Sequence, residues 1–376
     1  MEPEEQWRLE RVDELKSLAD QRCPLLVYNA ETLNEVFFDL LSIDTVDKLF
    51  YRISANPHPK ILQKAFEMGL AFRCLSLREF SSLMTRFPRM DPDRVLLGPL
   101  HSLGPGESIG AFKPGATPLV PADPYTLKGR AGLFKNREIM LSFSLGKEKN
   151  PQDEVKEEEL KEISTLLKNA GCFLMGIHLE AVEALSLRED PKGLRWRLES
   201  LGGFFSGVSL WSLGNGAGTA AGPAHSSLDI PATGGNLESI RENHPDTSLW
   251  LEPGPLAIAG AGILLTKAIQ TRREGTYTLI TLDADMGALG LRGLSHQAHN
   301  FSRPHEEATV PSRIVWAGHG PDRGPWEMGP LPPVEKGDIL LFTNAGAREP
   351  HAGGPASPRR VPEHYLPARS MCPVKL

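Results

Sequence analysis

The chain has 376 residues, of which 40% are hydrophobic and 23% are charged, enough for a large barrel and a second domain. The formal net charge of −6 argues against nucleic acid or acidic membranes as partners. The chain has no apolar run near the roughly 20 residues that span a bilayer, and its acidic start is unlike a secretory or mitochondrial leader. We therefore expect a cytoplasmic protein. Its 4 scattered cysteines demand neither disulfides nor a zinc site.

Strand-like and helix-like segments alternate along the first two thirds of the chain. Apolar residues at helical spacing predict a charged helix over 5–20. From residue 25 onward the strand-like runs are, in chain order, LLVYNA, LFYRISAN, AFRCLS, RVLLGP, TPLVPA, EIMLSFSL, CFLMGIHLE, GVSLWSLGNG and LWLEPG. Repeated β–α units of this length predict a parallel sheet, and their number fits a closed (β/α)₈ barrel.

The pattern changes after about residue 260. The runs AGAGILLTKAIQTRR, TYTLITLDADM, RIVWAGHG and GDILLFTNAGA are β-rich and separated by turns, which predicts a second, antiparallel domain. We expect an N-terminal helical segment at 1–24, which could join this second domain, and a barrel over 25–260. The β-rich domain then covers 261–347, and the tail over 348–376, rich in Pro, Gly and Arg, is expected to be mobile.

One stretch carries a family resemblance. LFYRISANPHPKIL, residues 49–62, resembles the first strand and following helix of the alanine-racemase-like decarboxylases that depend on pyridoxal phosphate (PLP), closest to the diaminopimelate decarboxylase group. In that family the strand reads Y-A-x-K-A-N, and its lysine carries PLP as a Schiff base. Tyr51, Ala55 and Asn56 keep the pattern, but the lysine position is Ser54. A serine hydroxyl cannot form an imine with an aldehyde.

The resemblance is collinear over roughly residues 25–347. LWLEPG is similar to the strand before the family's E-P-G-R motif, HNFSRP to part of its D-A-G-M-N-x-L-x-R-P segment, and GDILLFTNAGA to G-D-x-x-x-x-x-D-A-G-A-Y. It implies a PLP-binding (β/α)₈ barrel followed by a β-rich C-terminal domain. Because the family's active sites form between two subunits, it also implies a homodimer, or a heterodimer with a related decarboxylase.

The resemblance assigns cofactor-binding roles to a few positions. Glu252 matches the carboxylate that keeps the pyridine nitrogen protonated, and Gly254 is kept, although the arginine expected next is Pro255. Gly214 and Gly216 align with the phosphate loop, although a plain glycine turn is an equal alternative. His178 lies two residues before the expected ring-supporting position and could substitute for it, while a packed barrel histidine is the simpler interpretation.

Several catalytic positions of the family are changed. The ring-supporting histidine is replaced by Glu180, the cysteine position lies near His319, and the tyrosine position is Arg348. Together with Ser54, these changes make ordinary decarboxylation improbable, and covalent attachment of PLP is not expected.

Other constellations are weaker. Ser54 has no evident base for a role as nucleophile, Lys60 should face solvent on the following helix, and Lys48 lies at the opposite end of the barrel from the chemistry. A loosely spaced set of acids and histidines predicts a surface role rather than a metal site: Asp283, Asp285, His296 and His299.

The leading hypothesis is a non-catalytic homologue with a regulatory or binding role. The alternative is a divergent PLP-dependent decarboxylase of diaminopimelate or another basic amino acid. A third hypothesis is noncovalent binding of a phosphate ligand through residues 214–218.

Overall fold

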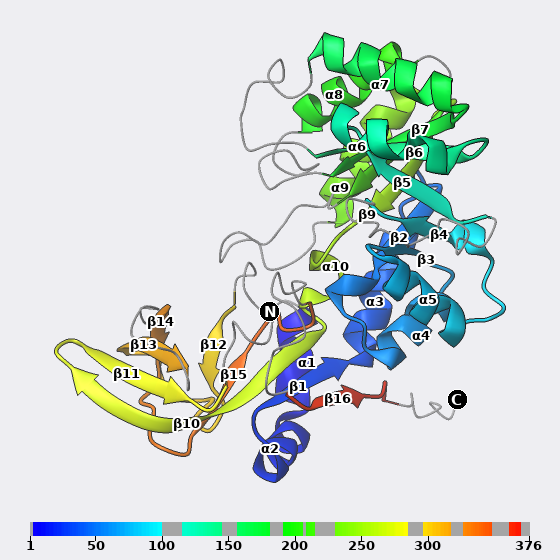
Figure 1. The fold of residues 1–376 in the computed structure, drawn as a ribbon. Coiled ribbons are helices and arrows are strands. Elements are labelled where there is room, and N and C mark those ends of the chain that lie inside the picture. The colour runs from blue at the N-terminus through cyan, green and yellow to red at the C-terminus, as the bar shows by residue number, and fades with distance from the viewer. Residues whose placement is uncertain are drawn as a thin grey trace. The chain divides into compact units, whose positions relative to one another are not determined.

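The structure, a computed structural model, describes residues 3–99, 115–144, 156–180, 191–205, 208–214, 230–284, 296–316, 326–347 and 361–369. The chain divides into two compact units. We call the described residues from Phe37 to Gly254 the barrel unit, and those up to Val36 and from Pro255 onward the sheet unit. Figure 1 shows the elements of both.

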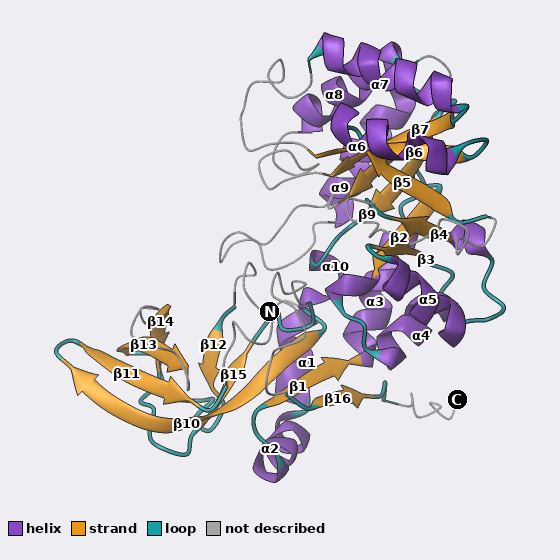
Figure 2. Cartoon of the chain, in the orientation of Figure 1, coloured by secondary structure: helices purple, strands orange, loops and turns teal. Residues whose placement is uncertain are grey.

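Eight parallel strands close the barrel in chain order, with β2 paired to β9. They are β2 (Lys48–Arg52), β3 (Ala71–Cys74), β4 (Val95–Leu97), β5 (Thr117–Pro121), β6 (Glu138–Ser144), β7 (Phe173–Glu180), β8 (Leu210–Gly214) and β9 (Ser248–Glu252). The helices of this unit are α4 (Pro59–Glu67), α5 (Leu77–Arg86), α6 (Pro124–Arg130), α7 (Glu157–Ala170), α8 (Pro191–Phe204) and α9 (Ile230–Asn243). Figure 2 shows α6, α7 and α8 outside the strands. The predicted (β/α)₈ barrel is confirmed.

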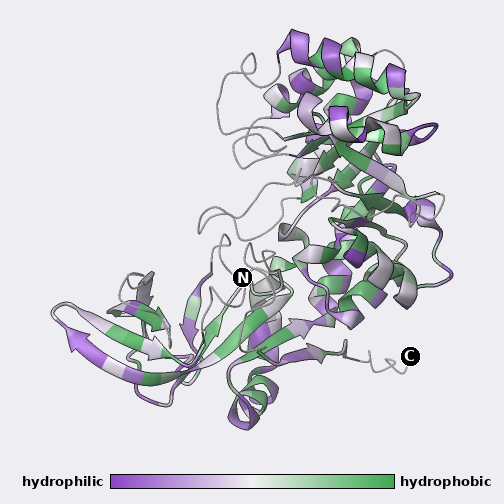
Figure 3. Cartoon of the chain, in the orientation of Figure 1, coloured by the Kyte–Doolittle hydropathy of each residue, from purple (hydrophilic) through white to green (hydrophobic). Residues whose placement is uncertain are grey.

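Local sequence signals explain where the helices begin and end. Pro59 opens α4, where the ring of His58 accepts a hydrogen bond from the Lys60 amide. Helix α7 ends at Gly171, whose φ of 67° is left-handed and suits glycine. Apolar and polar residues alternate along α7, seen as green and purple bands in Figure 3. Its buried residues are Leu160, Ile163 and Leu167, so its apolar stripe faces the barrel.

The barrel interior is layered. Tyr51 on β2 points outward, where its ring meets Phe37 and Phe72 edge-on, so its neighbours Phe50 and Arg52 point inward. One layer is apolar and contains Phe50, Ala71, Leu96, Leu119, Met140, Leu210 and Trp250. The next inward positions toward the carboxyl ends of the strands are largely polar: Arg52, Arg73, Ser142, His178, Ser212 and Glu252. In such barrels this is the end at which active sites lie.

The strand expected to open the barrel belongs instead to the sheet unit. β1 (Leu25–Asn29) pairs antiparallel with β10 (Gly262–Glu274) and parallel with β16 (Glu363–Leu366). Its backbone hydrogen bonds are thus satisfied outside the barrel, which closes with β2–β9 alone. β16 also lies within the segment that was expected to be a mobile tail, where the described part is a strand.

The sheet unit is mixed rather than antiparallel. Its main order is β12-β15-β10-β11-β13-β14. The strands not yet given are β11 (Tyr277–Leu282), β12 (Ala298–Asn300), β13 (Val310–Trp316), β14 (Trp326–Leu331) and β15 (Ile339–Phe342). β11 and β13 run parallel, because β12 intervenes between them in sequence and the chain returns to the same edge in the same direction.

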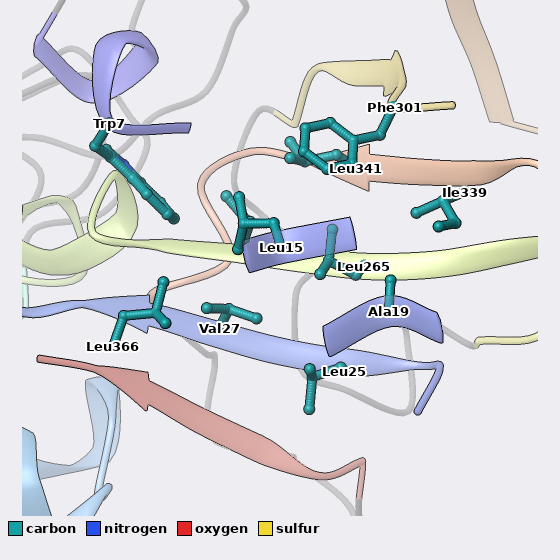
Figure 4. Packing of buried hydrophobic residues seen from close by; sticks show 11 residues of the cluster. Trp7, Leu15, Ala19, Leu25, Val27, Leu265, Phe301, Ile339, Leu341 and Leu366 are labelled. Atoms are coloured by element: carbon teal, nitrogen blue, oxygen red, sulfur yellow. The ribbon is translucent and has the colours of Figure 1, made fainter. Parts of the chain in front are cut away.

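The N-terminal residues form two helices and not the single one predicted. α1 (Pro3–Glu10) and α2 (Val12–Gln21) break at Arg11, whose φ of −113° is not helical and whose guanidinium donates to the Pro367 carbonyl. Trp7, Leu15 and Ala19 pack on apolar residues of β1, β10 and β15 (Figure 4). The N-terminal segment therefore belongs to the sheet unit, whose strands are linked to the barrel unit by α3 (Ala30–Leu41) and α10 (Leu256–Ala259). None of the described helices is long and apolar enough to cross a bilayer.

Candidate functional site

Two arginines and two glutamates form a closed ring of ion pairs at the carboxyl ends of the barrel strands. Four contacts make this arginine–glutamate ring: Arg52 Nη2 to Glu180 Oε1 at 2.5 Å, Arg52 Nε to Glu252 Oε1 at 2.5 Å, Arg73 Nη2 to Glu180 Oε2 at 2.7 Å, and Arg73 Nη1 to Glu252 Oε2 at 2.5 Å. The contact of Arg52 Nε with Glu252 is an ion pair without hydrogen-bond alignment. Positive and negative charges alternate around the ring and cancel.

The ring is withdrawn from solvent. The side chains of Arg73 and Glu252 are each 1% exposed, that of Arg52 is 12% exposed and that of Glu180 is 22% exposed. Buried ions persist only when they are paired. Arg73 meets this condition fully, because its Nε also donates to the Gly98 carbonyl at 3.2 Å.

The ring holds Arg52 and Glu180 in their charged forms. Burial alone lowers the pKa of Arg52, but the charges of Glu252 and Glu180 outweigh it and raise that pKa. Burial alone raises the pKa of Glu180, but Arg73, the hydrogen bond to His178 and Arg52 hold it well below its ordinary value. Both groups are therefore ionised at neutral pH.

His178 packs beside the ring. Its Nδ1 lies 2.9 Å from the Ser212 hydroxyl oxygen, and its Nε2 lies 2.9 Å from Arg73 Nη1 and 3.1 Å from Glu180 Oε2. Complete burial and then the charge of Arg73 lower the pKa of His178, so its imidazole is neutral at pH 7. The Arg73 guanidinium can only donate and the Glu180 carboxylate can only accept, so Nε2 bonds one of these two neighbours at a time, while Nδ1 pairs with the Ser212 hydroxyl, which can donate or accept. His178 and Glu180 share one strand face, as the period of two predicts.

Gly214 ends β8 directly beneath these side chains. A Cβ built on it would lie 2.5 Å from His178 Nε2 and 3.0 Å from Arg73 Nη1. Side chains therefore fill the space above this glycine, which the resemblance assigns to the phosphate loop. The other loop position, Gly216, lies outside the described residues.

The described part of the barrel offers no lysine in its interior. Ser54 lies in a 3₁₀ turn over Ile53–Ala55, and its buried hydroxyl has no hydrogen-bond partner among the described residues. Lys48 begins β2, with its Nζ 4.8 Å from the centre of the Trp250 ring, and Lys60 is exposed on α4. No lysine belongs to the buried polar residues of the described chain.

These residues do not fit PLP. The cofactor needs an amine for its aldehyde and a free carboxylate for its ring nitrogen. In the barrel, both oxygens of Glu252 already face arginines, and the described interior has no amine to offer. The two arginines and two glutamates instead pair with one another.

The remaining predicted positions are dispersed. His319, Arg348 and Asp285 lie outside the described residues, and Gly254 follows β9 with a φ of 75°.

The other candidates for a metal site lie in the sheet unit. Asp283 accepts from the Thr266 hydroxyl and the Lys267 amide. His296 and His299 help line a groove of about 810 Å³ in the sheet unit. The described residues contain no cluster of three or more His, Cys, Asp or Glu that could hold a metal ion.

Sequence reasoning missed Arg52 and Arg73. Both left a signal in the sequence. Arg52 stands at the alanine position of the family's Y-A-x-K-A-N pattern, and Arg73 interrupts the otherwise apolar strand AFRC. A charged residue on a strand buried on both faces requires a partner of opposite charge.

Comparisons with known proteins agree with the fold. No family model matches the chain. It is 26% identical to diaminopimelate decarboxylase of Deinococcus radiodurans over 352 residues, which cover 86% of this chain and 84% of the relative.

Several solved structures that share this fold are decarboxylases. Lysine decarboxylase from Selenomonas ruminantium matches with a TM-score of 0.72 and 19% identity over 94% of this chain and 95% of its own. Lysine/ornithine decarboxylase complexed with putrescine, from Vibrio vulnificus, matches with a TM-score of 0.76 and 14% identity over 95% and 98%. A further match was solved in complex with PLP and cadaverine. The chain is homologous to diaminopimelate decarboxylase and has the fold of the PLP-dependent decarboxylases.

Proposed function

We propose that this chain is a non-catalytic homologue of diaminopimelate decarboxylase with a regulatory or binding role. One observation carries the proposal. Glu252 stands at the position of the family carboxylate that faces the cofactor's ring nitrogen, and here it is paired with Arg52 and Arg73 inside the barrel. The absence of a lysine from the described barrel interior supports it. Without that amine, the exchange of an internal imine for one with the substrate has no starting point.

The partner we propose is a second decarboxylase-fold subunit, either another copy of this chain or an active relative. The support is the resemblance, which implies sites shared between two subunits and pairing through the β-rich domain. Light scattering on the purified chain distinguishes the cases: a homodimer has twice the mass of 41.2 kDa. A monomer that still captures no decarboxylase-fold subunit from its own organism would contradict the binding role.

The alternative is a divergent PLP-dependent decarboxylase acting on a diamino or basic amino acid. The extent of the homology to an enzyme, 352 residues at 26% identity, favours it. It requires a lysine from elsewhere in the chain and predicts carbon dioxide release that depends on added PLP.

The deciding experiment is incubation of the full chain with PLP, reduction with borohydride and mass mapping of modified lysines. We expect no stoichiometric adduct at any single lysine. The diaminopimelate decarboxylase of Deinococcus radiodurans, treated in parallel, is the positive control. A single stoichiometric adduct in the barrel, with carbon dioxide release from a diamino acid, would establish the enzyme instead.

A further inference from the structure

We infer that Arg73, supported by Arg52, occupies the cofactor's place in the barrel, so that PLP is excluded by two separate changes and not by the lost lysine alone. This inference rests on the proposed non-catalytic function and deepens it. The first change is Ser54 at the lysine position. The second is a guanidinium built into the site.

Arg73 reaches both of the positions that the resemblance assigns to the two ends of the cofactor. Its Nη1 lies 2.5 Å from Glu252 Oε2, where the ring nitrogen is expected. The same Nη1 lies 3.0 Å from the point where a Cβ on Gly214 would stand, at the start of the expected phosphate loop. One side chain thus lies against Glu252 and against Gly214, the last residue of β8, after which the phosphate loop is expected.

The replacement also matches in charge. A protonated pyridine nitrogen presents a cation to its carboxylate, and a guanidinium presents the same charge to Glu252. The guanidinium does not deprotonate in proteins, so this cation is permanent. The charge of Glu252 is consequently paired without any cofactor, which the charge of a free carboxylate with 1% exposure would not be.

The arginine is held firmly in that place. Its four polar contacts are Glu252, Glu180, His178 and the Gly98 carbonyl. A cofactor entering the barrel would have to displace a buried, fully paired ion and leave it without equivalent partners. The intramolecular ring therefore competes directly with PLP.

The test separates the two changes. The variants are Ser54→Lys, Ser54→Lys with Arg73→Ala, and Ser54→Lys with Arg86→Ala, in which Arg86 is an exposed arginine of α5. Each is incubated with PLP, reduced with borohydride and mapped by mass. We expect the introduced lysine to be labelled at least tenfold more when Arg73 is removed, and no gain from Arg86→Ala.

The double variant keeps the balance of charge in the barrel interior, because the introduced lysine restores the cation that Arg73→Ala removes. Should that double variant fail to fold, Ser54→Lys with Arg73→Gln keeps a polar side chain and makes the same comparison. Equal labelling of Ser54→Lys with and without Arg73 would overturn the inference. So would a folded double variant that stays unlabelled. Neither result touches the proposed function, which fails instead if the unaltered chain forms a stoichiometric lysine adduct.

Discussion

Arg73 Nη1 lies 2.5 Å from Glu252 Oε2, and both side chains are 1% exposed. The two residues come from β3 and β9, which do not pair with each other, so only the closed barrel brings them together. This contact pairs the charge of a carboxylate that the resemblance assigns to the cofactor's ring nitrogen. With the other three contacts of the arginine–glutamate ring, it balances the buried charges of the barrel interior without a cofactor.

Breaking the ring should destabilise the barrel strongly. Arg73→Met keeps the length of the side chain but leaves Glu252 and Glu180 with a single cation between them. We expect the free energy of unfolding to fall by about 3–5 kcal/mol, the usual cost of removing one partner of a buried pair. Urea unfolding followed by circular dichroism measures it.

The matched control is Lys128→Met. Lys128 Nζ lies 2.6 Å from Glu162 Oε1, but the two side chains are 60% and 41% exposed. An exposed pair is screened by water, so we expect a change within about 0.5 kcal/mol. If both variants lose the same stability, burial does not govern the ring's contribution.

The close packing above Gly214 gives a second prediction. Gly214→Ala places a Cβ 2.5 Å from His178 Nε2, so His178 or the strand must move, and we expect a loss of about 1–3 kcal/mol. Gly203→Ala is the same substitution in α8 with no atom within 4 Å of the new Cβ. Because alanine favours helix over glycine, Gly203→Ala should be neutral or stabilising. Similar unfolding midpoints for the two variants would show that the space above Gly214 is open.

The barrel could be predicted because its signal is local. Each β–α unit carries its own alternation of apolar runs and helix caps, and Glu252 was found because it ends a strand within a recognisable motif. The strand over Leu25–Asn29 was misplaced because its partners, β10 and β16, lie more than two hundred residues away in the chain. An apolar run shows that a strand is buried but does not show against which other strand.

The arginine–glutamate ring could not be predicted from local sequence patterns, because its members are also far apart in the chain. Arg52, Arg73, Glu180 and Glu252 come from four strands and meet only through barrel closure. Glu180 and His178 were judged singly, as a lost catalytic position and as a packed histidine. His178 is indeed packed in the barrel, and both residues contact the same guanidinium, that of Arg73. A search for charges on buried strands would have found the two arginines, and charge balance would have paired them with the two glutamates.

The pH dependence of stability should show two windows of loss, both on acidification. Burial, with the charge of Arg73, lowers the pKa of His178 below 6.5, so the unfolded chain takes up a proton first and stability falls as pH drops below about 6.5. The pKa of Glu180 lies well below 4.5, so its contribution is complete above 4.5 and is lost at lower pH, as the carboxylate protonates. Urea midpoints measured between pH 8 and pH 3 report both.

His178→Gln isolates the upper window. Glutamine can accept from Arg73 and donate to Ser212 but does not titrate, so the loss below pH 6.5 should diminish while the loss below pH 4.5 remains. An unchanged profile above pH 5 would show that His178 stays as easily protonated in the folded barrel as in the unfolded chain.

Two serines of the barrel interior should respond in opposite ways to one substitution. Ser142 is 4% exposed and its hydroxyl has no hydrogen-bond partner in the described structure, whereas Ser212, 1% exposed, is bonded to His178 Nδ1 at 2.9 Å. Ser142→Ala removes an unsatisfied polar group, so we expect unchanged or higher stability. Ser212→Ala leaves the buried Nδ1 of His178 without its hydrogen-bond partner, which costs about 1–3 kcal/mol. Thermal unfolding of the two variants side by side tests this. A destabilising Ser142→Ala would mean that its hydroxyl has a partner, such as bound water or a ligand, and that the barrel interior is not closed around the ring.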